Sequence, residues 1–387
     1  MKKKTLLIIL GNLTAFGPFI TDFYLPCLPE LTSYFSQPEA VIQISLTAGM
    51  LGLAAGQLLI GPVSDKWGRR RPLIWSLALF ILSTLGCILS TDIHPFLFFR
   101  LCQGLTGAGG LVISKAIVAD KFKAEQLSKY FAFLAAVQGM APIVAPVVGG
   151  AAFSLTSWQG AFAMLGLWAI VLWVACRRLE ETLPEERRLH IPAWKTFQCY
   201  VSVIGNSRFS VMTLLQGFAS AALMAYISAS PFIFQNHFGL TPMLYSIVFA
   251  FNATGLVMGS AVIMKMQDMR KATGLSTAGL FLTSALASAA LVQEWHFALF
   301  EIALFLMLFC VGMITPVAMS RALRAVGDNK GVASALLGAL PFLLGGIVAP
   351  LTGIGNMNHS TPLLIMCCTI ICMILWLLSL RQDRQET

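Results

Sequence analysis

GPVSDKWGRRRP, residues Gly61–Pro72, lies between two long apolar runs. Five of the seven residues from position 65 to position 71 are charged, in a chain that is 57% hydrophobic and only 11% charged. A short basic loop between two membrane spans is typical of the cytoplasmic side of a membrane. An anchor that holds the loop in the cytoplasm explains the charge, whereas the ordered pattern G-P-x-S-D-x-x-G-R-R calls for a more specific explanation.

Apolar runs of about 20 residues recur along the whole 387-residue chain, and each can cross a hydrocarbon core of roughly 30 Å. The alternating segments of about ten residues that mark a membrane β-barrel do not appear. Together with a mean hydropathy of +0.79, this predicts an all-α integral membrane protein with twelve transmembrane helices. The basic and apolar start of the chain is interpreted as part of the first span, because no clear signal-cleavage site follows it. The expected spans are 5–27, 41–61, 72–91, 96–118, 128–152, 159–176, 209–234, 242–264, 273–292, 297–319, 331–355 and 361–380.

The basic residues follow the predicted topology. The loops on one side of the membrane hold nearly all of the 26 lysines and arginines, and the loops on the other side hold none. Arg100 is the one basic residue expected in the outer half of the membrane. The positive-inside rule therefore predicts a multi-pass membrane protein with both termini in the cytoplasm; a bacterial inner membrane is the expected location once the family resemblance described below is included. The net charge of +9 reflects this topology, and no nucleic-acid partner is expected.

The sequence shows no motif that indicates an enzyme. The nine cysteines show no metal-ligand spacing, and most lie in apolar runs, so they are interpreted as free, buried thiols without a metal or a disulfide framework. There is no nucleotide-binding loop and no sizeable soluble domain. We therefore do not expect an enzyme, and a membrane enzyme or receptor is kept as the alternative from another class.

One polar segment divides the chain into two halves. Arg177–Arg208 is the longest stretch outside the predicted spans, and its acidic and basic charges nearly cancel, as in a solvated linker. Within it, the aromatic-bearing stretch from Ile191 to Ile204 is of a kind that can lie along the membrane surface. The predicted domains are an N-terminal six-helix bundle (1–180), a cytoplasmic linker (181–208) and a C-terminal six-helix bundle (209–387).

A weak internal repeat relates the fifth and eleventh predicted spans. V-A-P-V-V-G at Val144–Gly149 reappears as V-A-P-L-T-G at Val348–Gly353. The equivalent place of the two stretches in their halves favours duplication over chance. The fifth span also contains residues that can bend a helix or let helices pack closely, and either role is open for each. These residues are Pro142, Pro146, Gly149 and Gly150.

Four stretches carry a family resemblance. The pattern in Gly61–Pro72 resembles the loop between helices 2 and 3 that marks the major facilitator superfamily of transporters. TDFYLPCLPEL (Thr21–Leu31) resembles the helix 1 signature of its Bcr/CflA group of drug:proton antiporters. FFRLCQGLTGAGG (Phe98–Gly110) is similar to the arginine-glutamine-glycine motif of helix 4. APIVAPVVGG (Ala141–Gly150) is similar to the proline-glycine motif of exporters, although Ala145 precedes the proline where glycine is usual.

The resemblance covers essentially the whole chain and implies a function. It implies a major facilitator fold and proton-coupled efflux of small lipophilic compounds or drugs by alternating access. Protons would be the coupling ion, and no other cofactor is expected. The partners would be a small-molecule substrate and the lipid bilayer, with the protein acting as a monomer. A dedicated metabolite exporter and a proton-coupled importer remain the alternatives within transport.

Asp22 and Arg100 are the most informative charged residues within the spans. Asp22 lies about 25 Å from the inner start of its helix, and Arg100 about 6 Å from the outer start of its own. The two are therefore at similar depth and can pair, because an isolated intramembrane charge is costly. The alternative is that each side chain reaches the outer surface and merely anchors its helix. A carboxylate that alternately pairs with Arg100 and takes a proton would provide coupling, and the resemblance supports this role for both positions.

Glu301 is the remaining acid placed inside a span. It lies about four residues into the tenth span from the outside, where an interfacial side chain with its head in water is one interpretation. A proton-coupling site is the other, since the tenth span corresponds to the fourth span in the repeat. Both interpretations remain open from the sequence.

The basic loop has a second interpretation as a conformational latch. Gly61 and Gly68 permit tight turns and close helix approach. The resemblance implies that Asp65 faces the N-terminal end of the eleventh span, where a helix dipole favours an anion. It also implies that Arg69 pairs with Asp120 at the inner end of the fourth span. The alternative is that these charges only keep the loop soluble.

The substrate cavity is expected near the middle of the membrane. Polar amides within spans need partners or water, so they are better candidates than aromatic residues, which more often face lipid or the core. The expected cavity is apolar with few hydrogen-bonding groups, which suits lipophilic compounds. The candidates by depth are Asn12, Phe16, Phe19, Gln57, Gln138, Gln216, Phe218, Tyr226, Phe251 and Asn252.

Overall fold

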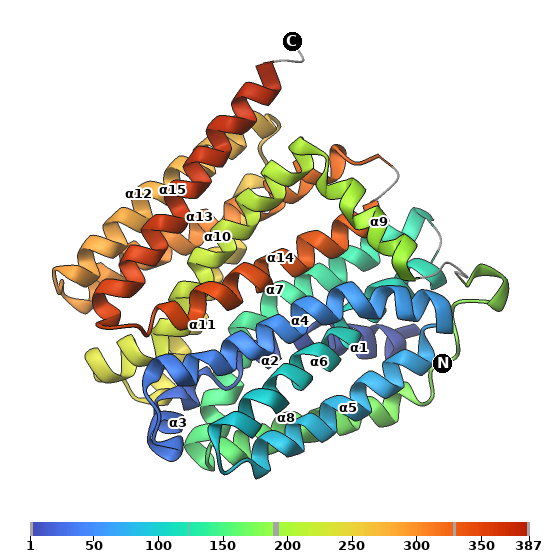
Figure 1. Cartoon of the computed structure of the whole chain (residues 1–387), viewed down its shortest axis with the longest axis horizontal. Helices are drawn as coiled ribbons and strands as arrows, with labels where there is room; N and C mark the ends of the chain where they lie inside the picture. The colour runs from blue at the N-terminus through green and yellow to red at the C-terminus, as the bar shows by residue number, and fades with distance from the viewer. Residues whose placement is uncertain (1–2, 123, 189–192, 328–329, 385–387) are drawn as a thin grey trace. The chain divides into compact units, whose positions relative to one another are not determined.

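The computed structural model describes residues 3–122, 124–188, 193–327 and 330–384 (Figure 1). Within these ranges the regular structure is helical, with no strand. Twelve helical segments of the described chain are long and apolar enough to cross a membrane. The prediction of an all-α, twelve-span membrane protein is therefore confirmed.

The chain divides into two compact units. The first contains Met1–Pro38, Ile44–Thr196 and Pro242–Ile247, and the second contains Glu39–Gln43, Phe197–Thr241 and Val248–Thr387. The helices wholly or mainly in the first unit are α1 (Lys3–Thr14), α2 (Phe16–Asp22), α3 (Leu28–Phe35), α4 (Glu39–Trp67), α5 (Arg70–Leu89), α6 (Ile93–Lys121), α7 (Ala124–Leu155) and α8 (Trp158–Cys176). Those wholly or mainly in the second are α9 (Ala193–Ile204), α10 (Ser207–Phe232), α11 (Pro242–Ile263), α12 (Met269–Val292), α13 (Phe297–Arg324), α14 (Lys330–Leu351) and α15 (Met357–Arg384). The domain boundaries expected from the sequence stay a prediction.

The short helix α9 covers most of the stretch for which a position along the membrane surface was considered. Residues 191–192 of that stretch lie outside the described residues. Its position at a membrane surface stays a prediction.

The first span is broken rather than continuous. α1 and α2 are separated at Ala15, and after Asp22 the chain continues through a 3₁₀ turn at Leu25–Cys27 into α3. Pro26 has no N–H to donate to the carbonyl four residues earlier, so the helix cannot continue regularly past Asp22. The expected single helix over 5–27 is therefore corrected to an interrupted one that extends to Phe35.

The loop expected between the second and third spans is much shorter than predicted. α4 continues to Trp67 and α5 begins at Arg70, so Gly68 and Arg69 alone separate them. The prediction of a turn at Gly61 is wrong, because this glycine lies inside α4. Hydropathy falls where the charged residues begin, but backbone hydrogen bonding does not depend on side-chain polarity and the helix continues beyond that point.

Close backbone packing recurs in both units. A Cβ atom at Gly52 or Gly104 would overlap a backbone carbonyl of the partner helix, so α4 and α6 pack backbone against backbone. In the second unit, Gly259 and Gly312 have the same relation between α11 and α13. Small residues let membrane helices approach this closely. Since both pairs are the second and fourth long helices of their halves, the packing agrees with the internal repeat.

Candidate functional site

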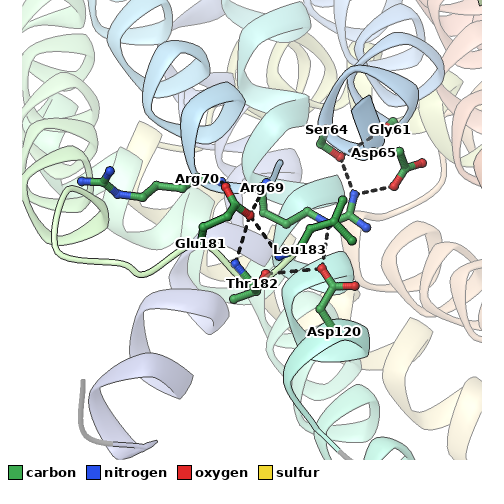
Figure 2. A network of polar contacts seen from close by, with 9 residues as sticks. All are labelled: Gly61, Ser64, Asp65, Arg69, Arg70, Asp120, Glu181, Thr182 and Leu183. Atoms are coloured by element: carbon green, nitrogen blue, oxygen red, sulfur yellow. Dashed lines mark hydrogen bonds and ion pairs between the residues drawn. The ribbon is translucent and has the colours of Figure 1, made fainter. Parts of the chain in front are cut away.

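An ionic network at the junction of α4, α5 and α6 is centred on Arg69 (Figure 2). Its Nε lies 2.8 Å from Oδ2 of Asp120, and its Nη1 lies 2.5 Å from Oδ1 of Asp65. Nη1 also donates to the hydroxyl of Ser64 at 2.8 Å. The Arg69 side chain is only 9% exposed, so these contacts replace its hydration. The pairing of Arg69 with Asp120 is confirmed as a contact, whereas the approach of Asp65 to the eleventh span, α14, stays a prediction.

Glu181, which follows α8, completes the network (Figure 2). One carboxylate oxygen accepts the backbone N–H groups of Arg69, Thr182 and Leu183 at 2.7, 3.0 and 3.1 Å, and the other accepts that of Arg70 at 3.1 Å. Partial burial alone would raise the pKa of the Glu181 carboxyl, but these four donors favour the charged form and the net result is a lowered pKa. Glu181 therefore supplies the N-terminal cap that α5 does not take from its own sequence.

Gly68 is required where the network closes. Its φ of +85° lies in the region that glycine adopts readily. A Cβ atom at this position would also collide with the carboxylate of Glu181. Gly68 thus serves the tight turn and the close approach that the sequence predicted for it.

A second ionic network occupies the corresponding part of the second unit. Asp383, near the end of α15, accepts from Nη2 of Arg321 on both of its carboxylate oxygens, at 2.8 and 3.0 Å. Arg270 at the start of α12 lies 3.5 Å from the same carboxylate. The carboxylate of Asp268 accepts the N–H groups of Lys271 and Arg270, and these bonds, led by that of Lys271, lower its pKa and cap α12.

Arg100 is fully buried in the first unit without a carboxylate partner. Nη2 donates to the carbonyl of Ile20 at 2.9 Å, Nη1 donates to Oε1 of Gln103, and Nε donates to the carbonyl of Ser45 at 3.4 Å. The guanidinium also lies 4.1 Å from the ring centroid of Tyr24, within the range of a cation–π contact. Neutral acceptors from three segments thus hold this charge and tie α2, α4 and α6 together.

Asp22 is buried near Arg100 but does not pair with it. The one hydrogen bond recorded for its carboxylate comes from the hydroxyl of Thr21 at 2.7 Å, and none of the ion pairs of the described residues includes Asp22. The expected Asp22–Arg100 pair is therefore absent from this structure. The physical reason is that backbone and amide acceptors already bind the guanidinium, with the carbonyl of Ile20 at 2.9 Å, while Asp22 accepts from the adjacent hydroxyl of Thr21. The expected outward snorkelling is also absent, since both side chains are buried.

The substrate-binding candidates of the first unit have protein partners. Asn12 accepts a hydrogen bond from Trp168 at 3.1 Å and donates to the carbonyl of Ile8 at 2.9 Å. Phe16 is fully buried and stacks on Trp168, with ring centroids 4.5 Å apart, and Phe19 lies 4.8 Å from the same ring. Asn12 and Phe16 therefore act in the packing of α1 and α2 against α8 in this structure. The other two candidates are Gln57, which is buried, and Gln138, which is half-buried.

In the second unit, two candidates, Asn252 and Tyr226, lie in one cluster with the acid Glu301. Neither carboxylate oxygen of Glu301 has a hydrogen-bond partner, and both are shielded from solvent. The fully buried side chain of Asn252 lies beside this carboxyl and donates to the hydroxyl of Tyr226 at 3.2 Å. The interfacial interpretation expected the carboxyl of Glu301 in water, whereas the structure shields both of its oxygens from solvent.

The remaining candidates of the second unit are dispersed. Gln216 is buried and its Oε1 has no partner, while Phe218 is half-buried. Phe251 is 54% exposed and stacks on Phe305 at 4.9 Å, as a lipid-facing residue would. These placements leave the binding roles as predictions.

The helix-bending candidates lie inside a single helix. Pro142 and Pro146 are internal to α7, which continues to Leu155. A Cβ atom at Gly149 would overlap the carbonyl of Phe23, so this glycine permits close packing of α7 on the first span. Gly150 follows it in the same helix, and bending at any of these positions stays a prediction.

Sequence reasoning missed Glu181, Thr182 and the second network. Glu181 is one of eight charged residues in Arg177–Arg188, whose charges cancel, and no local signal separates it from Glu180. Asp383 likewise occurs in a charged C-terminal tail. The Asp268 cap could have been found, since an acid directly before a helix with basic residues next to it is a recognised start signal.

In the described part of the chain, twelve helices long and apolar enough to span a membrane lie in two compact units, with buried charges held at helix contacts, as in a multi-pass membrane protein. The model of the Major Facilitator Superfamily matches residues 7–350. The chain therefore belongs to this family of transporters, and it is not an enzyme.

Individual relatives agree with this assignment. The chain is 36% identical to "Uncharacterized MFS-type transporter YdgK" of Bacillus subtilis (strain 168), over 94% of this chain and 91% of that protein. It is 26% identical to "Bicyclomycin resistance protein homolog" of Haemophilus influenzae, over 94% and 93% of the two chains. A D-xylose-proton symporter crystal structure superposes with a TM-score of 0.81 at 14% identity, over 97% and 98% of the chains, and shows the common fold. The relatives are consistent with the resemblance to the Bcr/CflA group.

Proposed function

We propose that this transporter exports small lipophilic compounds, drugs among them, across the bacterial inner membrane in exchange for protons. Export would proceed by alternating access, with one chain sufficient and both termini in the cytoplasm. The similarity to a bicyclomycin resistance protein homolog supports efflux of drugs. The absence of Lys and Arg from the alternate loops supports the orientation of the termini.

The observation that carries proton coupling is the state of Asp22. Its carboxylate is buried in the first span, with a hydroxyl as its recorded partner and no cation. An intramembrane carboxylate without a counter-charge is costly and usually functional. A proton is the simplest partner that removes the charge, and a rearrangement that turns Asp22 toward Arg100 would release that proton.

Arg100 has a different part in this proposal. Because its guanidinium is held by the carbonyl of Ile20, it contacts the same helix as Asp22 two residues away. A rearrangement of α2 that turns the Asp22 side chain toward Arg100 would exchange the carbonyl for the carboxylate. Arg100 would then be the cation that favours release of the proton from Asp22.

A susceptibility panel tests export and coupling together. Drug-sensitive bacteria would express the native protein, Asp22→Asn, Arg100→Ala or Thr21→Val at matched membrane levels and meet chemically diverse antimicrobials. We expect protection by the native protein, loss with the first two variants and retention with Thr21→Val, which keeps the carboxyl. Protection that survives both charge variants would leave export standing and overturn the role of Asp22. Resistance to no compound would favour a dedicated metabolite exporter or an importer.

Proteoliposomes separate coupling from export. Proteoliposomes containing the purified protein would be loaded with a protective compound, and an imposed pH gradient would drive transport. A pH-sensitive dye inside the vesicles would report proton flux. We expect substrate-dependent proton movement by the native protein. Asp22→Asn is expected to retain substrate exchange without proton movement. Equal proton flux in the two proteins would contradict the proposal.

A further inference from the structure

Glu301, Asn252 and Tyr226 form a polar chain across three helices of the second unit. Glu301 lies one turn into α13, Asn252 in α11 and Tyr226 in α10. Three acceptor atoms of this cluster have no hydrogen-bond partner, namely both carboxylate oxygens of Glu301 and Oδ1 of Asn252, and the Asn252 side chain lies beside the Glu301 carboxyl. The amide nitrogen of Asn252 is 3.2 Å from the Tyr226 hydroxyl. Buried polar atoms in proteins nearly always have partners, so this cluster requires an explanation.

The surrounding helices provide no cation near Glu301. α10, α12 and α14 pack against α13, and α11 contacts it through the hydroxyl of Ser260 on the carbonyl of Gly312. α11 contains no charged residue. Besides lysine, arginine and Glu301, the titratable groups of these helices and of the cap of α13 are Tyr226, Tyr245, Cys310 and His296, whose Nδ1 accepts the N–H of Ala298. The charged residues of the other three helices are Arg208 in α10, Arg270 and Lys271 in α12, and Lys330 in α14.

These cations lie at the far end of the helices. Arg321 of α13 donates to the hydroxyl of Thr273, which fixes the start of α12 beside the end of α13. Glu301 and Arg321 are 20 residues apart on one helix, which corresponds to about 30 Å. On α10, Tyr226 is 18 residues beyond Arg208, or about 27 Å. Glu301 therefore cannot be neutralised by these basic residues.

We propose that Glu301 and Asn252 form a proton-binding site in the second unit, additional to Asp22. A proton from water adds the one missing donor: the new O–H of Glu301 donates to Oδ1 of Asn252, and no other covalent bond changes. A single proton thus satisfies one atom of each unpartnered group. Loss of that proton restores a carboxylate that the N–H groups of the Asn252 amide can stabilise.

The same amide links the proton to helix contacts. When Glu301 is ionised, the Asn252 NH₂ group turns toward the carboxylate, and Oδ1 accepts from the Tyr226 hydroxyl instead. The orientation of the Asn252 amide therefore couples the protonation state of Glu301 in α13 to the hydrogen bond with Tyr226 in α10. The use of this site in transport rests on the proposed function, whereas proton binding itself does not require a known substrate.

Infrared difference spectroscopy tests the site directly. Purified protein in lipid nanodiscs would be compared between acidic and alkaline buffers, and the C=O stretch of protonated carboxyl groups followed through the titration. Native protein is expected to show a buried-carboxyl band of which Glu301→Gln loses one component. Asn252→Leu is expected to shift this component toward that of a carboxyl without a hydrogen bond. Asp22→Asn should remove a different component and serves as the matched control.

The outcomes are decisive in either direction. A spectrum of Glu301→Gln identical to that of the native protein across the titration would overturn the proposal. An unshifted band in Asn252→Leu would overturn the role of the amide. In proteoliposomes, the number of protons moved per substrate should fall in Glu301→Gln while export continues. If no exported compound is found, the proposed function fails and the infrared result still decides the proton site.

Discussion

The Arg69–Asp120 contact should contribute measurably to stability, and a double-mutant cycle can isolate its energy. The cycle compares the native protein with Arg69→Ala, Asp120→Ala and the double variant. The Arg69→Ala chain keeps the backbone N–H that Glu181 accepts, so the cap of α5 is preserved. The cycle therefore reports the side-chain interaction and not the loss of the turn.

The expected size follows from distance and burial. The Nε–Oδ2 distance is 2.8 Å, and the two side chains are 9% and 16% exposed. Hydrogen bonds to charged groups contribute about 1.5–3 kcal/mol, and this range applies to a pair so well shielded. The Lys121–Glu180 pair is the matched control, because it lies 3.7 Å apart with side chains 35% and 70% exposed. Such an exposed pair contributes about 0–1 kcal/mol.

Denaturant unfolding in mixed micelles, followed by tryptophan fluorescence, would supply the four free energies of each cycle. We expect a coupling energy of about 2 kcal/mol for Arg69–Asp120 and close to zero for the control pair. Equal coupling energies in the two cycles would refute the reasoning that burial gives the Arg69 network its strength.

Two further substitutions test neighbouring features. Glu181→Gln should lower thermal stability at neutral pH but not in acid. A group whose pKa is lowered in the folded state stabilises the fold above its unfolded-state pKa, and this contribution is lost as the pH falls through the folded-state pKa. Melting curves of both proteins over a pH series test this, and a difference in melting temperature that stays constant with pH would contradict it. Gly104→Ala should destabilise the protein by about 1–3 kcal/mol through overpacking. The control Gly139→Ala, with nothing within 4 Å of its added Cβ, should be neutral or slightly stabilising. Equal unfolding midpoints for the two variants would contradict the close packing of α4 on α6.

The sequence was sufficient for the spans because membrane crossing is a local property. Length and apolar composition of one segment decide whether it can cross, independently of its neighbours. The ends of helices were predicted less well for the same reason. Residues Ser64–Trp67 are polar or charged in part, yet they remain helical because each turn stabilises the next through the backbone.

The Asp22–Arg100 prediction shows where one-dimensional reasoning ends. Depth along a helix can be counted in residues, and both residues are indeed buried. The direction in which a side chain points depends on helix rotation and on breaks such as the one after Asp22. Neither can be counted from the sequence, so two residues at one depth were expected to pair although the arginine contacts the carbonyl of Ile20.

The two ionic networks show how a repeat can be retained while its charges change. Arg69 and Asp120 of the first unit correspond to Arg270 and Arg321 of the second, each 201 residues further on, and Glu181 corresponds to Asp383 after 202 residues. The end of the fourth long helix thus carries an acid in the first unit and a base in the second, and a search for matching charges would not align these networks.

Helix capping explains why the exchange of charge is tolerated. In the first unit, α5 has no side-chain cap of its own, so Glu181 binds the backbone N–H groups at the start of that helix, and Asp120 together with Asp65 neutralises Arg69. In the second unit, Asp268 caps α12 locally. Asp383, the counterpart of Glu181, is then available to bind a cation, and an arginine at position 321 supplies it at 2.8 Å. One local cap thus changes which sign of charge the neighbouring helix end must carry.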